Sequence, residues 1–148
     1  MSQGADIILL VEDNPDHAEL TIDAIKRSKV VNPVVWVEDG ESALDYLYCR
    51  GPFADRAGGH PALCLLDIKL PGVDGIAVLK AIRQDDAFAA MPIVMLTTSN
   101  QEAEVMGAYL NHANSYVVKP IDFDDFYKRV QEMNIYWMLT NYAPDDSR

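Results

Sequence analysis

The stretch LCLLDIKLPGVDG, residues 63–75, is an apolar run that ends at a carboxylate, Asp67. Residues 63–66 show no polar alternation, which is typical of a short strand covered on both faces. Burying an unpaired charge costs several kcal/mol or more, so we expect Asp67 where the strand reaches the surface, beside a group that balances its charge. The proline and glycines behind it predict a turn.

The rest of the chain alternates between strand and helix patterns. Apolar runs predict strands at 7–11, 34–37, 63–66, 92–97 and 115–119. Helical spacing of apolar residues predicts helices in a segment that closes near residue 30, and at about 41–50, 75–85, 101–112 and 122–142. This alternation predicts an α/β domain with a parallel sheet and helices on both faces.

Composition limits the function classes. Of the 148 residues, 49% are apolar, and 12 basic against 23 acidic residues give a net charge of -11. Binding to nucleic acid needs clustered Lys and Arg, which this sequence lacks, so we expect no nucleic-acid partner. No apolar run is long enough to cross a bilayer, the amino-terminal residues lack a secretory signal, and Cys49 and Cys64 do not form a disulfide framework. We therefore expect a cytoplasmic protein.

Four of the predicted strands end in polar residues or are followed at once by them. They are Glu12 and Asp13, then Asp67, Thr97 and Lys119. The carboxyl ends of parallel strands meet at one edge of a sheet, so these side chains should form one site. Three adjacent carboxylates repel one another, and a hard divalent cation such as Mg²⁺ relieves that repulsion. Asp67 is then a candidate nucleophile for a phosphoryl group.

Four motifs carry a resemblance to a known family: LLVEDN at 9–14, LLDIKLPGVDG at 65–75, MLTTS at 95–99 and YVVKP at 116–120. In this order they resemble the response-regulator receiver domain of two-component signalling, over residues 7 to about 137. The resemblance implies a flavodoxin-like, doubly wound sheet of five parallel strands in the order 2-1-3-4-5, with five helices, in a single domain over 1–148.

The resemblance also implies a phosphoacceptor role for Asp67. A sensor histidine kinase would supply the phosphoryl group in a reaction that needs Mg²⁺, with Mn²⁺ as a substitute. Asp13 and Asp67 would bind the cation directly, Glu12 mostly through water, and Lys69 through its backbone carbonyl. The protein would be a switch that catalyses only its own phosphotransfer and dephosphorylation, and would not act as an enzyme on a separate substrate.

Three further residues would bind the phosphoryl group or change conformation in response to it. Thr97 and Lys119 would bind its oxygens, and Tyr116 would turn inward behind Thr97. The signal would leave through the face of the fourth helix, fifth strand and fifth helix. In this family the bond between Lys119 and Pro120 is usually cis.

Other interpretations stay open at this point. Taken alone, Asp13 or Asn14 could simply cap the first helix. A receiver-like scaffold that is never phosphorylated is one rival function. Another is a phosphatase of the haloacid-dehalogenase type, which needs a second acid at the position that Lys69 occupies here.

The last predicted helix, at about 122–142, carries apolar residues beyond those that a core-facing stripe needs. They include Ile135, Met138 and Tyr142, which together with Trp137, the last residue of that stripe, indicate a locally buried end or a partner surface, most simply a symmetric homodimer. This segment and the long loop at 51–61 resemble single-domain regulators that pair with bacterial phytochrome kinases. A bacteriophytochrome is therefore a candidate partner, with output through protein contacts and with no nucleic acid or membrane.

Overall fold

The computed structural model describes residues 7–27, 30, 32–56, 58, 60–97, 115–118, 124, 127 and 128, with the backbone alone at 97 and 115–118. Five parallel strands form one sheet in the order β2-β1-β3-β4-β5, as predicted. The strands are β1 (Ile8–Val11), β2 (Val34–Val37), β3 (Leu63–Asp67), β4 (Ile93–Thr97) and β5 (Ser115–Val118). Each lies within one or two residues of its predicted range.

The described helices are α1 (Pro15–Arg27), α2 (Gly40–Tyr48) and α3 (Gly75–Arg83), with 3₁₀ turns at η2 (Gly51–Phe53) and η3 (Asp86–Phe88). Helix α1, predicted to close near residue 30, is described as far as Arg27; residues 28 and 29 lie outside the described residues, and Val30 is buried. The helix predicted at 101–112, the Lys119–Pro120 bond and most of the helix predicted at 122–142 lie outside the described residues.

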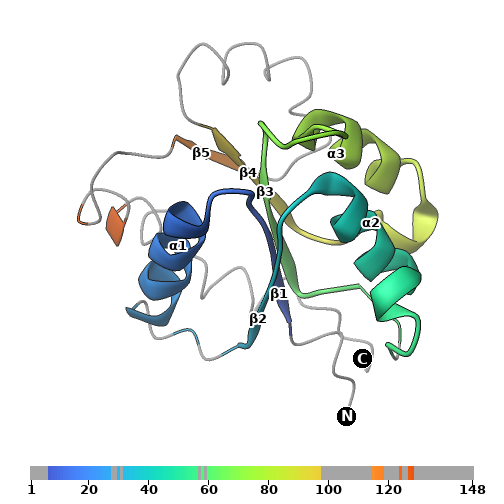
Figure 1. Ribbon diagram of the computed structural model, residues 1–148, viewed down its shortest axis with the longest axis horizontal. Helices are drawn as coiled ribbons and strands as arrows, with labels where there is room; N and C mark the ends of the chain where they lie inside the picture. The colour runs from blue at the N-terminus through green and yellow to red at the C-terminus, as the bar shows by residue number, and fades with distance from the viewer. Residues whose placement is uncertain are drawn as a thin grey trace.

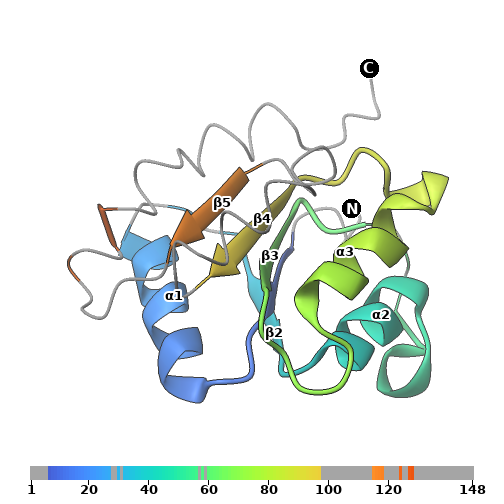
Figure 2. The ribbon, with the colours of Figure 1, turned by 90° about the horizontal axis from the view of Figure 1, so that it is seen from above.

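The sheet is covered on both faces (Figure 1), and the view from above agrees (Figure 2). Helix α1 packs on one face, while α2 and α3 pack on the other. Side chains of a strand alternate between faces, so β1 divides its residues between two hydrophobic clusters. Leu9 and Val11 join the α2 and α3 side, and Ile8 and Leu10 join the α1 side. Burial on both faces explains the absence of polar alternation in β1 and β3.

Strand register brings the carboxyl ends of the strands to one edge. Val11 of β1 lies beside Leu66 of β3, and Asp67 lies beside Leu96 of β4. The next rung pairs Thr97 with Val118 of β5. The polar residues that follow these strands therefore leave the sheet on a common side.

The helices begin at that same edge, each with a side-chain cap. Asn14 Oδ1 accepts hydrogen bonds from the backbone N–H groups of Asp16 (2.8 Å) and His17 (3.2 Å), so Asn14 rather than Asp13 caps α1. Asp39 and Asp74 cap α2 and α3 in the same way. The cap leaves the Asp13 side chain available for another role. In the part of the chain that the structure describes, no helix is long and apolar enough to span a membrane.

Candidate functional site

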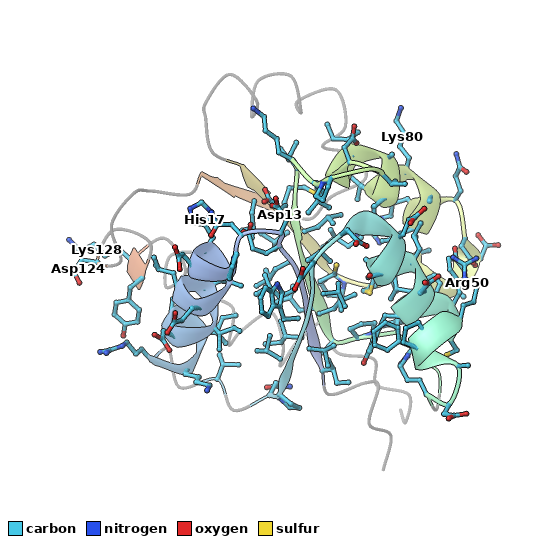
Figure 3. All side chains as sticks on the ribbon, viewed as in Figure 1. Asp13, His17, Arg50, Lys80, Asp124 and Lys128 are labelled. Atoms are coloured by element: carbon cyan, nitrogen blue, oxygen red, sulfur yellow. The ribbon has the colours of Figure 1, made fainter. Side chains whose placement is uncertain are left out.

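Three carboxylates meet at the carboxyl edge of the sheet. Glu12, Asp13 and Asp67 each offer one oxygen, and these oxygens all lie within 4.8 Å of one another. Glu12 is 0% exposed and Asp67 is 4% exposed, whereas Asp13 is open to solvent. Figure 3 shows Asp13 at this edge, between the start of α1 and the end of β3. The cluster is therefore buried on one side and accessible on the other.

The loop behind Asp67 is held tightly against the sheet. The Ile68 N–H donates to the Leu96 carbonyl (2.9 Å), and the Gly75 N–H donates to the Ile68 carbonyl (2.8 Å). A Cβ atom on Gly75 would collide with the backbone carbonyl of Asp67, so only glycine allows α3 to start so close to β3. Lys69 lies in this loop with an exposed side chain. The loop thus fixes the backbone from which Asp67 projects.

Hydrogen bonds hold both the backbone and the side chain of Glu12. Its backbone N–H donates to the Val37 carbonyl (3.0 Å), and its backbone carbonyl accepts from the indole Nε1 of Trp36 (2.7 Å). Its carboxylate Oε2 accepts from the Asn14 backbone N–H (3.1 Å). Backbone and side chain of Glu12 are therefore both tied to neighbouring segments.

The electrostatics of the three carboxylates favour a bound cation. Two like charges at such a separation repel by about 1 to 3 kcal/mol, depending on whether the surroundings screen like water or like a protein surface. Carboxylate oxygens are the ligands that Mg²⁺ and Mn²⁺ prefer, and Mg²⁺ usually retains water on an open side such as the one that Asp13 faces. The donor set therefore fits a hard divalent cation.

Comparison with known proteins identifies the family. Residues 8–131 match the family described as response regulator receiver domain. The chain is a response-regulator receiver domain. Among curated relatives, it is 42% identical over 140 residues to the probable methanogenesis regulatory protein FilR2 of Methanothrix harundinacea (strain 6Ac), covering 93% of this chain and 87% of FilR2. It is 34% identical to the response regulator Rcp1 of Synechocystis sp., covering 93% of this chain and 92% of Rcp1.

Solved structures of similar receiver domains include regulators of phytochrome signalling. The bacteriophytochrome response regulator RtBRR is 45% identical with a TM-score of 0.79, covering 89% of this chain and 80% of RtBRR. The Mn²⁺-bound form of Rcp1 is 34% identical with a TM-score of 0.78, covering 90% of this chain and 94% of that one. The phosphorylated cyanobacterial phytochrome regulator RcpA is 34% identical with a TM-score of 0.81, covering 95% and 99% of the two chains.

The structure of this receiver domain brings together part of the predicted site. Glu12, Asp13 and Asp67 gather as expected from the strand order. The backbones of Thr97 and Tyr116 lie in β4 and β5, and β5 ends one residue before Lys119. The side chains of these three residues lie outside the described part of the receiver domain, as do the predicted dimer residues Ile135, Trp137, Met138 and Tyr142. The roles predicted for them remain predictions.

Two contributors to the site were not recognised from the sequence. Trp36 is 24 positions from Glu12 and reaches it only because β2 pairs with β1 in parallel. Gly75 is the last residue of the LLDIKLPGVDG motif, but its steric role depends on how α3 approaches the Asp67 carbonyl. The first contact depends on the register that pairs Leu10 with Trp36, which the sequence alone does not indicate.

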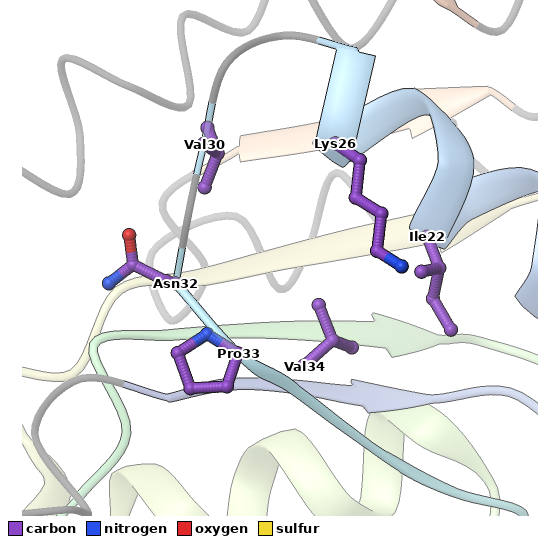
Figure 4. Close-up of a pocket in the computed structure, with 6 residues that line it drawn as sticks. All are labelled: Ile22, Lys26, Val30, Asn32, Pro33 and Val34. Atoms are coloured by element: carbon purple, nitrogen blue, oxygen red, sulfur yellow. The ribbon is translucent and has the colours of Figure 1, made fainter.

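A separate hollow lies at the opposite edge of the receiver domain, where α1 ends and β2 begins (Figure 4). Its volume is about 710 Å³, and its lining residues are Ile22, Lys26, Val30, Asn32, Pro33 and Val34. Lys26 is the one ionisable residue among them. The carboxylates are elsewhere, and these lining residues do not form an acid–base pair, so we assign this hollow no chemistry.

Proposed function

We propose that this receiver domain accepts a phosphoryl group on Asp67 from the phosphohistidine of a sensor kinase, in a reaction that depends on a divalent cation. The observation that carries the proposal is the gathering of Glu12, Asp13 and Asp67 oxygens within 4.8 Å at an open edge of the sheet. A manganese-bound structure of the relative Rcp1 and a phosphorylated structure of RcpA support the same chemistry.

In this proposal Asp67 is the nucleophile. A carboxylate oxygen of Asp67 attacks phosphorus, and the imidazole leaves with the electron pair of the P–N bond, so that an acyl phosphate replaces a phosphoramidate. The Gly75 contact and the Ile68 hydrogen bonds keep the Asp67 backbone still during the attack. Asp13, Asp67, Glu12 and the Lys69 carbonyl would hold Mg²⁺ or Mn²⁺. When bound, the cation neutralises charge on the transferring group.

The same proposal covers the response to phosphorylation. Thr97 and Lys119 would bind the phosphoryl oxygens, and Tyr116 would turn inward, so that the face beside β5 changes its shape for a partner protein. The domain would act as a switch and would catalyse only its own phosphotransfer and dephosphorylation. A bacteriophytochrome is the proposed kinase, because the similar RtBRR is a bacteriophytochrome response regulator and RcpA is a cyanobacterial phytochrome response regulator. The free cysteines Cys49 and Cys64 fit a reducing, cytoplasmic setting.

The test uses acetyl phosphate as the phosphoryl donor. We expect one phosphoryl adduct by intact mass when Mg²⁺ is present, none with a chelator, and none in Asp67→Asn. Asp86→Asn, which removes an exposed carboxylate of η3, should keep the adduct. If the wild type shows neither an adduct nor release of inorganic phosphate, the unphosphorylated scaffold becomes the better description.

We further propose that the protein forms a symmetric homodimer through the apolar residues of its carboxyl-terminal segment. Met138→Glu would place a charge in that surface and Trp137→Ala would remove its largest side chain, so both should shift the protein toward monomer. Light scattering over a dilution series measures the shift. A mass that stays unchanged in both variants would contradict the dimer.

A further inference from the structure

We infer that Trp36 is a positioning residue for the cation site. Its indole N–H would hold the peptide group between Glu12 and Asp13, so that both carboxylates face Asp67 before a cation arrives. This inference rests on the proposed function only in that it takes the three carboxylates to bind a divalent cation.

The contact joins the edge strand to the site. Trp36 Nε1 lies 2.7 Å from the backbone carbonyl oxygen of Glu12, which is short for a hydrogen bond from nitrogen. The ladder between β1 and β2 ends at Val11 and Val37, and the Glu12 N–H adds a bond to the Val37 carbonyl (3.0 Å). The indole therefore extends the attachment of β1 to β2 by one further acceptor, through a side chain.

The bonded oxygen belongs to a specific peptide group. The Glu12 carbonyl lies in the planar unit that also contains the Asp13 nitrogen, so fixing this oxygen fixes the plane from which Asp13 departs. Rotation of that plane would swing the Asp13 side chain relative to Glu12 and Asp67. Because the three carboxylates repel one another, such a rotation would lower their mutual repulsion when no cation is bound.

The other side of the segment is held independently. The Asn14 N–H donates to Glu12 Oε2 (3.1 Å), and Asn14 Oδ1 caps α1 through the backbone N–H groups of Asp16 and His17. Asp13 thus lies between one attachment at α1 and another at β2. Trp36 contributes the part of this support that can be removed without changing a carboxylate or the helix cap.

Exposure separates the hydrogen bond from simple packing. Trp36 is 36% exposed on the edge strand, so it is not a core residue whose loss should collapse the fold. Removing its N–H should instead leave the segment free to sample arrangements with Asp13 turned away. Cation binding must then select the competent arrangement, and the apparent affinity falls by the fraction that is competent.

The experiment removes the indole N–H donor in two ways. Trp36→Phe removes the N–H together with part of the ring, and β-(3-benzothienyl)alanine at position 36 replaces only the N–H by sulfur. The affinity for Mn²⁺ is measured from the electron paramagnetic resonance signal of the free ion. A hydrogen bond of ordinary strength predicts about two- to tenfold weaker binding in both variants.

A kinetic readout separates positioning from general damage. At saturating Mg²⁺ the rate of phosphorylation by acetyl phosphate should approach that of the wild type, while the Mg²⁺ concentration for half-maximal rate should rise by the same two- to tenfold. Tyr48→Phe is the matched control, because Tyr48 is also 36% exposed and its hydroxyl is lost at α2, away from the carboxylates. Its Mn²⁺ affinity should equal that of the wild type.

Unchanged Mn²⁺ affinity in the benzothienylalanine variant would overturn the inference, as would a wild type that binds no Mn²⁺. A wild type that binds Mn²⁺ but takes no phosphoryl group would remove the proposed function and leave the role of Trp36 standing. The two failures are therefore distinguishable in one series of measurements.

Discussion

The two edges of the sheet treat their charges in opposite ways. At the carboxyl edge, Glu12, Asp13 and Asp67 bring three like charges together. At the amino edge, the Arg56 guanidinium donates to the backbone carbonyls of Tyr46 (2.8 Å) and Leu47 (3.4 Å), at the carboxyl-terminal end of α2. It also lies 4.2 Å from the centre of the Tyr46 ring.

The difference shows which edge is complete by itself. A cation placed on the last carbonyls of a helix is matched to the helix dipole, so the amino edge stabilises the fold with groups of this chain. The carboxyl edge instead holds a repulsive arrangement in place through backbone and indole hydrogen bonds. Such local conflict within an otherwise consistent fold is typical of a functional site.

Gly75→Ala should have the largest effect on the free energy of unfolding. The added methyl group meets the Asp67 carbonyl, and backbone on both sides leaves little room to adjust, so we expect a loss of about 3 kcal/mol and weaker Mn²⁺ binding. Urea denaturation and Mn²⁺ titration measure the two effects.

Gly58→Ala is the counterpart at the amino edge. Gly58 has a φ of +93° but nothing within 4 Å of an added Cβ, so the change costs only the strained backbone, about 1 to 2 kcal/mol, and should leave Mn²⁺ affinity intact. Equal losses of stability and of affinity in the two variants would contradict the steric explanation for Gly75.

Arg56→Ala should lower the free energy of unfolding by about 2 kcal/mol, because it removes charged hydrogen bonds and a cation–π contact. Mn²⁺ affinity should not change, because Arg56 ties the loop at 51–61 to α2 and not to the carboxylates. Arg56→Lys keeps the charge without the planar fork and should recover only part of the loss. A drop in Mn²⁺ affinity in Arg56→Ala would show that the edges are coupled.

Asp13→Asn should raise the free energy of unfolding, whereas the preceding variants lower it. In the presence of a chelator, removal of one of three like charges should raise the free energy of unfolding by about 1 kcal/mol, while Mn²⁺ affinity falls. Asp23→Asn removes an exposed carboxylate of α1 and serves as the control. If Asp13→Asn were less stable than the wild type, repulsion among the three carboxylates would not be what lowers the stability of the cation-free domain.

Cys64, in the central strand β3, should give the smallest effect. Burial raises the pKa of its thiol from 9.0 to about 12, so the folded protein keeps its proton where the unfolded chain begins to lose it. The stabilisation is complete below pH 9 and declines as pH rises from 9 toward 12, with a loss of somewhat less than about 1 kcal/mol at pH 9.5. Unfolding curves at pH 8 and 9.5 should show this extra slope in wild type and Cys49→Ser and lose it in Cys64→Ala.

Much of the fold was predictable because apolar runs report burial directly. The strand ranges followed from runs such as 63–66, and the meeting of Asp13 with Asp67 followed from the parallel order. Helix ends were less predictable. The helix predicted at about 41–50 covers Gly40–Tyr48 in the structure, with Asp39 as its cap, because an Asp-Gly pair suits a turn as well as the start of a helix.

Contacts between distant segments were the part that the sequence could not supply. The bond from Trp36 to Glu12 needs the register of β1 on β2, and the steric role of Gly75 needs the path of α3 over β3. Composition carries neither quantity. The side chains of Thr97, Tyr116 and Lys119 lie outside the described part of the chain, so the roles that the sequence indicates for them stay predictions.

The strand order has a further consequence for how the domain forms. Every neighbouring pair of strands in the sheet is parallel, so no pair is joined by a hairpin turn. Ile8 of β1 pairs with Val34 on one side and with Leu63 on the other, and both partners come later in the chain. The hydrogen bond from the Tyr127 hydroxyl to the Arg27 carbonyl (3.2 Å) joins residues that are 100 positions apart. A nascent chain therefore emerges with its most apolar strand unpaired, and this topology makes folding slow relative to helical domains of the same length.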